Sequence, residues 1–462
     1  MNLWWMVGII VILTVAAIGA WFGLGFLVRS LMNRQADQVI TRIFTELYTK
    51  NLWEGVHAMR RFGVEAVVEN ELRTAHEGPL MKPIGSARPF PNFDGLLFTP
   101  AQLYKRPLND TVAVNAAVTL GKRCERPMTL STPIMVTAMG YGVALSKPFV
   151  HALAKGTASA GTAFNSGQGP VLKEYRSLAH RMIVQYHGGS WKPSDDDIAQ
   201  ADMIEIRYGQ GANAGSSTIV PASDLTSELL QDFGISATDS GNLRIPAGIP
   251  GVQKAQDLKR LVERLRTIGK GAPIALKLAA GADLTRDMEV AAYAGVDVIV
   301  IDGAQAGTHG SPAILVDDFG IPTLSGLCKA VQYLKEQRLE NEIDLVVSGG
   351  LRTPGDILKA VCLGARAVYM GNAILFATMH EQITKALPFE PPTQLAWANG
   401  SLHEQFDEDL GAQSLARFLT NSTEELKAGL RALGKMSIAD VKAEDMVAWD
   451  PEVARITGLP LV

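Results

Sequence analysis

The stretch VVSGGLRTPGDILKAVCLGARAVYMGNAIL, residues 346–375, decides the fold. It includes the end of one short apolar run at 344–347, a helical pattern at 354–363 and a second apolar run at 367–370. Runs that are apolar throughout are typical of parallel strands buried on both faces. A strand, a helix and a second strand in this order form a βαβ unit, so the stretch predicts a parallel α/β sheet.

The same alternation extends from this unit toward the N-terminus. Six further apolar runs lie at 133–136, 161–164, 182–186, 203–207, 274–278 and 296–301, and further helical patterns lie at 147–158, 253–268, 285–294 and 324–336. Eight strands that are mostly separated by helices predict an α/β fold of the (β/α)8 TIM-barrel class. A doubly wound sheet is the alternative, but TAMGYG at 137–142 lacks the GxGxxG spacing that such a sheet would use.

The regions around the strands suggest four segments. We expect a transmembrane anchor at 1–29, a helical stalk with an irregular connector at 30–129, the barrel at 130–387 and a small helical extension at 388–462. Residues 208–252 are rich in Gly, Ala and Ser and are too long for a simple connection. We therefore expect them to form an extended loop over the barrel mouth.

The first segment carries the prediction of cellular location. Residues 3–28 contain no charged side chain, and about 20 apolar residues suffice for a helix to span a bilayer. Arg29 and Arg34 follow this run and no basic residue precedes it, which predicts a single-pass protein of the cell membrane with a cytoplasmic catalytic body. The lipid bilayer would then be a partner. A cleaved signal peptide is the competing interpretation, but no basic residue opens the chain.

Composition excludes several classes of protein. Among 462 residues, 43 Lys and Arg face 47 Asp and Glu, so the net charge is −4 and no basic excess is present to bind nucleic acid. The three cysteines, Cys124, Cys328 and Cys362, lie far apart with no CxxC pair. A disulfide framework and a cysteine-rich metal site are therefore not expected.

Glycine and polar residues gather where the predicted strands end. Gly349-Gly350 and Gly371-Asn372 follow the last two strands, and backbone N–H groups at these positions can bind a phosphate. Lys277 interrupts the apolar strand IALKL, where a lysine needs a partner such as the Asp302 carboxylate or the edge of a flavin ring. Gln210 is a further candidate to contact a flavin, and His309 is either an acid–base group or a solvated loop residue.

These residues belong to stretches that resemble a known family. The stretches include PIMVTAMGYGVALS (133–146), AGTAFNSGQGP (160–170), ADMIEIRYGQGANAG (201–215), AGVDVIVIDGAQAGTHGSP (294–312) and the segment 346–375. In order and spacing they resemble the FMN-binding synthase domain of glutamate synthases. The resemblance is greatest to stand-alone glutamate synthase-like proteins with an N-terminal membrane segment.

The resemblance implies a barrel that binds FMN at the carboxyl ends of its strands, with no metal site. It implies that Lys277 and Gln168 are catalytic. The residues expected to bind FMN are Ala138, Met139, Gly140 and Tyr141 along the ring system, Asn165, Gln210 and Lys277 at the ring or its edge, Asp302 and Gly303 near the ribityl chain, and Gly349, Gly350, Gly371 and Asn372 at the phosphate. The implied reaction is reductive amination of 2-oxoglutarate to L-glutamate.

The chain departs from the family pattern in ways that bear on this reaction. Gln168 stands where the family commonly has a proton-handling glutamate, and Asn213 replaces a lysine. An amide cannot exchange a proton as a carboxyl group does, so we expect weak glutamate formation. Residues 373–394 contain no cysteine for the family's iron–sulfur cluster, so no cluster is expected. Ammonia and electrons would come from outside, and the electron donor is not identified.

Two other functions remain open at this point. One is an FMN oxidoreductase with a different substrate, exchanging electrons with a quinone. The other is a membrane-tethered flavin-binding protein that docks a partner without turnover. A nucleotide dehydrogenase barrel would need a reactive cysteine in a mouth loop, whereas the three cysteines lie before the predicted barrel or in predicted helices.

Overall fold

The computed structural model describes residues 3–236 and 241–462, and the side chains of residues 3–12 and 15–18 lie outside this description. The chain divides into two compact units, Met1–Leu80 and Met81–Val462. Each unit is described by itself. The predicted domain boundaries at residues 29, 129 and 387 stay predictions.

The first unit consists of three helices, α1 (Leu3–Thr45), α2 (Trp53–Phe62) and α3 (Val64–Ala75). Asn51 fixes the turn between the first two, because its Nδ2 donates to the Ile43 carbonyl at 2.7 Å and its Oδ1 accepts from the Trp53 N–H at 2.9 Å. Gly63, with φ of +84°, separates α2 from α3 in a backbone conformation that favours glycine. Residues 53–62 and 64–75 are thus helical, with Gly63 between them.

The predicted membrane anchor is contradicted. Within the described residues, no helix combines the length and the apolar character needed to cross a bilayer. α1 does not end after the apolar run but continues as one helix through Arg29 to Thr45. Part of the predicted span falls outside the described side chains, and the described apolar stretch before Arg29 is shorter than the ~20 residues that a span needs. The prediction of a cell-membrane location with a cytoplasmic body is therefore wrong, and the bilayer is not retained as a partner.

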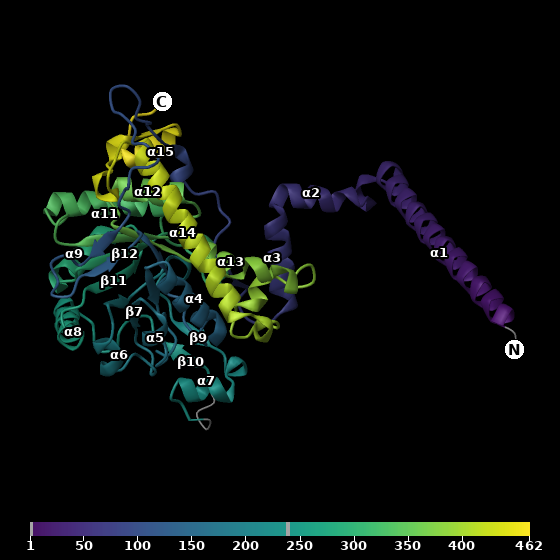
Figure 1. The fold of residues 1–462 in the computed structure, drawn as a ribbon, viewed down its shortest axis with the longest axis horizontal. Helices are drawn as coiled ribbons and strands as arrows, with labels where there is room; N and C mark the ends of the chain where they lie inside the picture. The colour runs from purple at the N-terminus through teal and green to yellow at the C-terminus, as the bar shows by residue number, and fades with distance from the viewer. Residues whose placement is uncertain (1–2, 237–240) are drawn as a thin grey trace. The chain divides into compact units, whose positions relative to one another are not determined.

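The second unit is built on eight parallel strands (Figure 1). In spatial order they are β5 (Ile134–Val136), β15 (Ala367–Met370), β14 (Asp344–Ser348), β12 (Val298–Asp302), β11 (Ile274–Ala279), β8 (Met203–Arg207), β7 (Arg181–Tyr186) and β6 (Ala163–Asn165). The first and last barrel strands in the sequence, β5 and β15, thus pair, and the hydroxyl of Thr162, just before β6, donates to the Ile134 carbonyl of β5. The sheet is a nearly closed (β/α)8 barrel, which confirms the predicted fold class.

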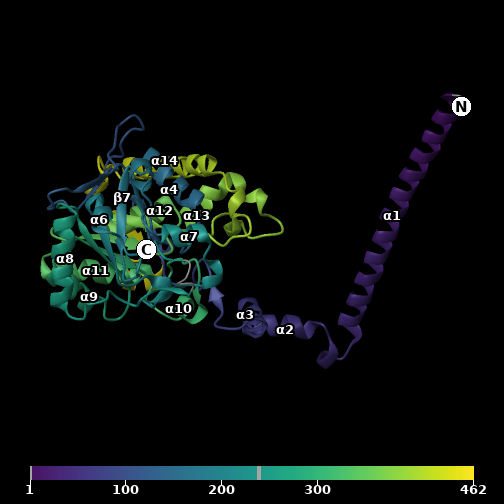
Figure 2. The same cartoon turned by 90° about the horizontal axis from the view of Figure 1, so that it is seen from below.

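Helices surround the strands in both views (Figure 2). They are α4 (Lys147–Ser159), α5 (Tyr175–Leu178), α6 (Asp195–Ala199), α8 (Ala255–Ile268), α9 (Leu284–Ala294), α11 (Thr323–Gln337), α12 (Pro354–Leu363) and α13 (Asn372–Met379). The five helices predicted in the barrel region match α4, α8, α9, α11 and α12 to within two residues at each end. The long α14 (Glu408–Ala432) packs along α4, so the C-terminal region completes the outer layer of the barrel.

The segment between β8 and α8 has more structure than predicted. It contains β9 (Thr218–Val220), α7 (Ser227–Asp232) and β10 (Leu243–Ile245), and β9 and β10 pair as antiparallel strands. α7 is held to the loop and helix after β5, because Asp232 accepts hydrogen bonds from the Tyr141 hydroxyl at 2.9 Å and the Lys147 ammonium at 3.0 Å. The described residues of this segment therefore cover part of the barrel mouth, as expected, and they form strands and helices of their own.

A second covering element comes from the start of the unit. We call residues 81–92 the mouth strap. Its β1 (Met81–Lys82) pairs with β13 (Ser311–Pro312), which lies between β12 and α10 (Ala313–Asp317). Asp317 accepts from Lys82 at 3.0 Å and from Ser86 at 2.7 Å. The strap thus runs beside the loop that leaves the carboxyl end of β12.

Short elements complete the unit at its periphery. β2 (Leu96–Phe98) pairs with β16 (Met446–Ala448) near α15 (Pro451–Thr457), and β3 (Val118–Leu120) forms a hairpin with β4 (Met128–Leu130) just before β5. The predicted irregular connector is therefore only partly irregular. The region predicted as a helical extension, 388–462, contains the long α14 as well as α15.

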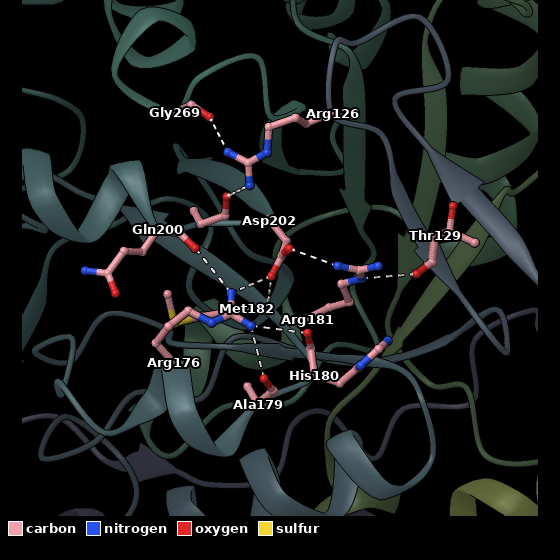
Figure 3. Close-up of polar contacts among 11 residues, drawn as sticks. Arg126, Thr129, Arg176, Ala179, His180, Arg181, Met182, Gln200, Asp202 and Gly269 are labelled. Atoms are coloured by element: carbon pink, nitrogen blue, oxygen red, sulfur yellow. Dashed lines mark hydrogen bonds and ion pairs between the residues drawn. The ribbon is translucent and has the colours of Figure 1, made fainter.

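A polar cluster ties the strands at their amino-terminal ends (Figure 3). Asp202, just before β8, accepts from Arg176 at 2.7 Å, from Arg181 at 3.3 Å and from the Met182 N–H at 2.9 Å. Arg126 donates nearby to the Gly269 carbonyl at 3.1 Å. In a barrel of this class, catalytic groups gather at the other end, so this cluster contributes stability.

Candidate functional site

A buried ion pair lies at the carboxyl ends of β11 and β12. Lys277 and Asp302 are 2% and 3% exposed, and their Nζ and Oδ2 atoms are 3.6 Å apart. The Lys277 ammonium also lies 3.4 Å from the Thr137 hydroxyl and 5.6 Å from the centre of the Tyr369 ring. The pairing that the sequence offered as an alternative role for Lys277 is thus present, and it holds the cation at the barrel mouth.

Asp302 is only partly satisfied. Its Oδ2 accepts from the Gly211 N–H at 3.1 Å, and its Oδ1 is buried with no hydrogen-bond partner among the described residues. A buried carboxylate oxygen without a donor is costly, so an additional donor at this point would be favourable. Gly211 approaches so closely that a Cβ there would overlap the Gly303 carbonyl oxygen.

A second polar group lies inside the barrel around Glu205. Its Oε1 accepts from Asn165 at 3.0 Å and from Gln185 at 2.7 Å, and Asn165 also donates to the Tyr369 hydroxyl at 3.1 Å. Burial, together with the charge of Glu205, raises the pKa of Tyr369 well above its ordinary value, so the phenol keeps its proton. Asn165 is therefore fixed in place by the barrel interior, beside the ring that the Lys277 cation faces.

The loops after β5 and β6 meet backbone to backbone. A Cβ on Gly140 would overlap the Gly169 nitrogen, and one on Gly167 would lie 2.5 Å from the Gly140 nitrogen. Glycine at these positions therefore permits a contact that no side chain would allow. Ala138 and Met139 remain partly exposed above this contact, whereas the Tyr141 hydroxyl is turned to Asp232 on α7.

The predicted phosphate region contains tightly packed glycines. Gly349 and Gly350 have φ of +111° and +69°, and a Cβ on Gly349 would lie 2.6 Å from the Thr323 hydroxyl. Gly303 packs against the same Thr323, which links the loops after β12 and β14. These loops can therefore present backbone N–H groups to a ligand without obstruction by their own side chains.

Asn372 and Gly371 begin α13 at the end of β15. The Asn372 amide donates to the Ile84 carbonyl of the mouth strap at 2.7 Å. Its side chain is thus occupied by the strap, and only its backbone N–H and that of Gly371 are candidates for a phosphate. Sequence reasoning assigned the residue to this region but could not foresee the strap.

The remaining predicted residues lie around the ends of β6 and β8. Gln168 accepts from the Trp191 indole N–H at 2.7 Å through its carbonyl oxygen, and its side-chain Oε1 accepts from Thr218 at 3.4 Å. Gln210 is half-buried at the start of the 3-10 turn Gly211–Asn213. His309 packs edge-on against Trp397 with ring centres 4.6 Å apart, and burial lowers its pKa.

Sequence reasoning missed four buried polar residues of this region, Glu205, Gln185, His187 and Arg207. Each is at most 2% exposed. The signal that singled out Lys277, a polar residue in or beside an apolar strand, was available for all four. The sequence analysis assigned no role to the polar residues on or directly after β7 and β8.

Both the sequence and the fold of this chain have known relatives. Residues 100–436 match the family described as the conserved region in glutamate synthase. The chain belongs to the glutamate synthase family. The "Glutamate synthase large subunit-like protein" of Rhizobium meliloti (strain 1021) is 30% identical over 82% of this chain and 89% of its own length. The predicted enzyme class, an FMN-dependent oxidoreductase of the glutamate synthase type, is thereby confirmed.

The chain spans less than two thirds of the length of several other members of the family. The "Archaeal-type glutamate synthase [NADPH]" of Thermotoga maritima is 30% identical over 72% of this chain, which spans 64% of that protein. Among solved structures, a flavocytochrome b2 mutant with benzoylformate has a TM-score of 0.51 at 17% identity, over 79% of this chain and 80% of that one. A second flavocytochrome b2 mutant, with pyruvate bound, gives the same TM-score at 16% identity, over the same shares. At this identity the likeness concerns the barrel fold alone.

Proposed function

We propose that this chain reduces a small 2-oxo acid at an FMN bound in the barrel mouth, with electrons supplied by an external donor. The nominal reaction is reductive amination of 2-oxoglutarate to L-glutamate with external ammonia. The observation that carries the proposal is the buried Lys277–Asp302 pair, with its unsatisfied Asp302 Oδ1, at the edge of glycine-lined loops.

The residues at the mouth fit the chemistry of FMN. The Lys277 ammonium would complement negative charge on the ring system, and the unpartnered Asp302 Oδ1 would accept from a hydroxyl of the ribityl chain. The glycine pair 349–350, with Gly371, would offer backbone N–H groups to the phosphate. Gly140 and the partly exposed Ala138 and Met139 would lie along the ring, with Asn165 and Gln210 at its edge.

Bound FMN would supply a two-electron carrier that passes a hydride equivalent to the substrate. The protein side chains would orient both molecules and hold protons. Tyr369 keeps its phenolic proton because burial and Glu205 raise its pKa. Gln168 can donate a hydrogen bond through its amide, but it cannot release a proton near neutral pH.

An iron–sulfur cluster finds no support among the thiols. Cys124 lies between β3 and β4, Cys328 on α11 and Cys362 on α12, so the three thiols belong to separate elements. A cluster needs thiolates. Within the described residues, no group of metal-ligating side chains comes together. We propose that electrons enter from a separate donor.

A different 2-oxo acid is the second candidate substrate. Gln168 and Asn213 favour it, because they remove an ionisable group and a cation where the family pattern has them. Asn213 is buried, and its side chain accepts from the Gly215 N–H at 3.3 Å. It offers no charge to a second carboxylate.

Purified protein tests the proposal. It should be yellow and release FMN on heating, and after anaerobic reduction the flavin should be reoxidised by a 2-oxo acid with ammonia. Lys277→Met should lower FMN affinity, whereas Lys335→Met, at an exposed position on α11, should not. Colourless protein that takes up no FMN, or a reduced flavin that no 2-oxo acid reoxidises, would contradict the proposal.

A further inference from the structure

Three buried hydrogen-bond donors near the carboxyl ends of β6, β7 and β8 have no acceptor. They are Nε of Arg207, Nε2 of His187 and Nε2 of Gln168, and none has a hydrogen-bond partner among the described residues. Their side chains belong to residues that are 2%, 0% and 8% exposed. Buried donors are almost always satisfied in folded proteins, so three in one region need an explanation.

Strand register places two of these side chains in the barrel interior. Gln185 is in register with Glu205, and their side chains meet at 2.7 Å inside the barrel. Arg207 comes two residues after Glu205, at the end of β8, and His187 comes two residues after Gln185, directly beyond the end of β7. By the alternation of strand side chains, both continue the inward-facing row one step nearer the mouth. Arg207 is also in register with Lys277 on β11.

Two sets of contacts connect Gln168 with His187 and Arg207. Trp191 donates to the Gln168 carbonyl at 2.7 Å, and its ring lies 5.7 Å from the His187 ring. On the other side, Thr218 donates to Gln168 Oε1 at 3.4 Å, and Arg207 Nη2 donates to the carbonyl of the nearby Ser216 at 3.4 Å. The three unpartnered donors therefore lie around one region at the mouth.

The protonation of His187 makes it a donor at this point. Its Nδ1 accepts from the Gly189 N–H at 3.1 Å, so the neutral ring carries its proton on Nε2. Burial, with the charges of Arg207 and Lys192, lowers the pKa of His187 to about 3. The ring therefore stays neutral, and its Nε2–H has no acceptor among the described residues.

The charge balance indicates what the acceptor is. The Arg207 guanidinium makes no ion pair within the described part of the chain, although the Asp302 charge acts on it, and burial lowers its pKa to about 10. It stays charged at neutral pH. A buried cation without a counter-ion is strongly unfavourable, and an anion with two oxygens would satisfy the Nε of the guanidinium together with the two neutral donors.

We propose that Arg207, His187 and Gln168 form a carboxylate site that binds a monocarboxylic 2-oxo acid. The inference deepens the proposed function, because it names the class of substrate on which the flavin would act. Arg207 is the cation of this group, Lys277 is already paired with Asp302, and the nearby Asn213 is neutral. One carboxylate is therefore matched by the buried charge of Arg207, and a second one, as in 2-oxoglutarate, meets no further unpaired buried cation among the described residues of this group.

Calorimetric titration of the full-length protein tests the site. The probes are pyruvate, 2-oxoglutarate and methyl pyruvate, which lacks the charge. Pyruvate should bind, methyl pyruvate should bind ~10- to 100-fold more weakly, and Arg207→Met should weaken pyruvate by a similar factor, as expected for one charge-assisted hydrogen bond. Arg286→Met, at an exposed arginine on α9, should leave the affinity unchanged.

Further variants keep the test decisive if Arg207→Met fails to fold. Arg207→Lys keeps the charge, and Gln168→Met removes one donor at similar volume; each should weaken pyruvate binding at unchanged FMN content. The proposal is overturned if pyruvate does not bind, if these variants bind it as well as the parent, or if 2-oxoglutarate binds at least tenfold more tightly than pyruvate. FMN content is measured in parallel, so a protein that binds pyruvate but no flavin would contradict the proposed function alone.

Discussion

Replacing Lys277 with Met should destabilise the barrel because it leaves Asp302 buried and nearly unpaired. At 3.6 Å, with an effective dielectric constant of about 20, the attraction between the two charges is roughly 5 kcal/mol. The cost of burying both ions offsets much of this attraction, so the intact pair contributes little net stability. Without Lys277, however, Asp302 keeps only the Gly211 N–H, and we expect a loss of about 3–5 kcal/mol in the free energy of unfolding.

A double-mutant cycle isolates this interaction. Urea unfolding of the flavin-free variants is followed by circular dichroism. Adding Asp302→Asn to Lys277→Met should recover most of the loss, to within about 2 kcal/mol of the parent, because the buried charge is gone. Arg286→Met is the control: its pair with Asp283 is similar in length, at 3.5 Å, but the side chains are 82% and 75% exposed. That variant should change stability by less than about 0.5 kcal/mol. The reasoning fails if Lys277→Met lowers the free energy of unfolding no more than the control does. It also fails if the loss in the double variant equals the sum of the losses in the two single variants.

Other outcomes follow from single positions. Gly350→Asp should abolish FMN binding, measured as released flavin, because a carboxylate would repel the phosphate from the loop after β14. Asn213→Lys should tighten 2-oxoglutarate by ~10-fold relative to pyruvate in calorimetry, since it adds the missing cation; an unchanged ratio would place residue 213 away from the ligand. Asp202→Ala should lower the free energy of unfolding in urea by about 3 kcal/mol, because it leaves Arg176 and Arg181 without their shared carboxylate. FMN affinity should not change, because this cluster lies far from the mouth. Iron and sulfide assays should find no cluster; one cluster per chain would refute the prediction drawn from the cysteines.

The barrel could be predicted because its strands are buried on both faces. Such strands appear as uninterrupted apolar runs, as in β12 and β14, and the helices between them have a clear helical period. The strands and the helix of the insertion after β8 could not be predicted in this way. Its paired strands, β9 and β10, are only three residues long and partly exposed, so no periodic pattern marks them.

The candidate site was predicted unevenly. Lys277 stood out because a charge in an apolar strand needs a partner, and the partner is Asp302, one of the two offered. Arg207 and His187 carry the same signal but were attributed to no role. The contact of Asn372 with Ile84 joins residues far apart in the sequence, so no local pattern could reveal it.

The membrane segment was misread for a different reason. The uncharged run before Arg29 was judged by itself, as a separate span that ends where the charges begin. In the structure, the run and the charged residues after it belong to one helix, α1, which continues to Thr45. An apolar composition predicts burial of some kind, but it does not by itself identify the environment.

The mouth strap imposes an order on the assembly of the protein. Ser86 bonds to a residue 231 positions later, and Ile84 bonds to one 288 positions later. Synthesis begins at the N-terminus, so the strap leaves the ribosome long before any of its partners exist. Its docking can be complete only after the last barrel strand, β15, and α13 have been made. During translation the carboxyl ends of the strands therefore lie open on the side that the strap later covers, and a segment made before any barrel strand is among the last to take its place.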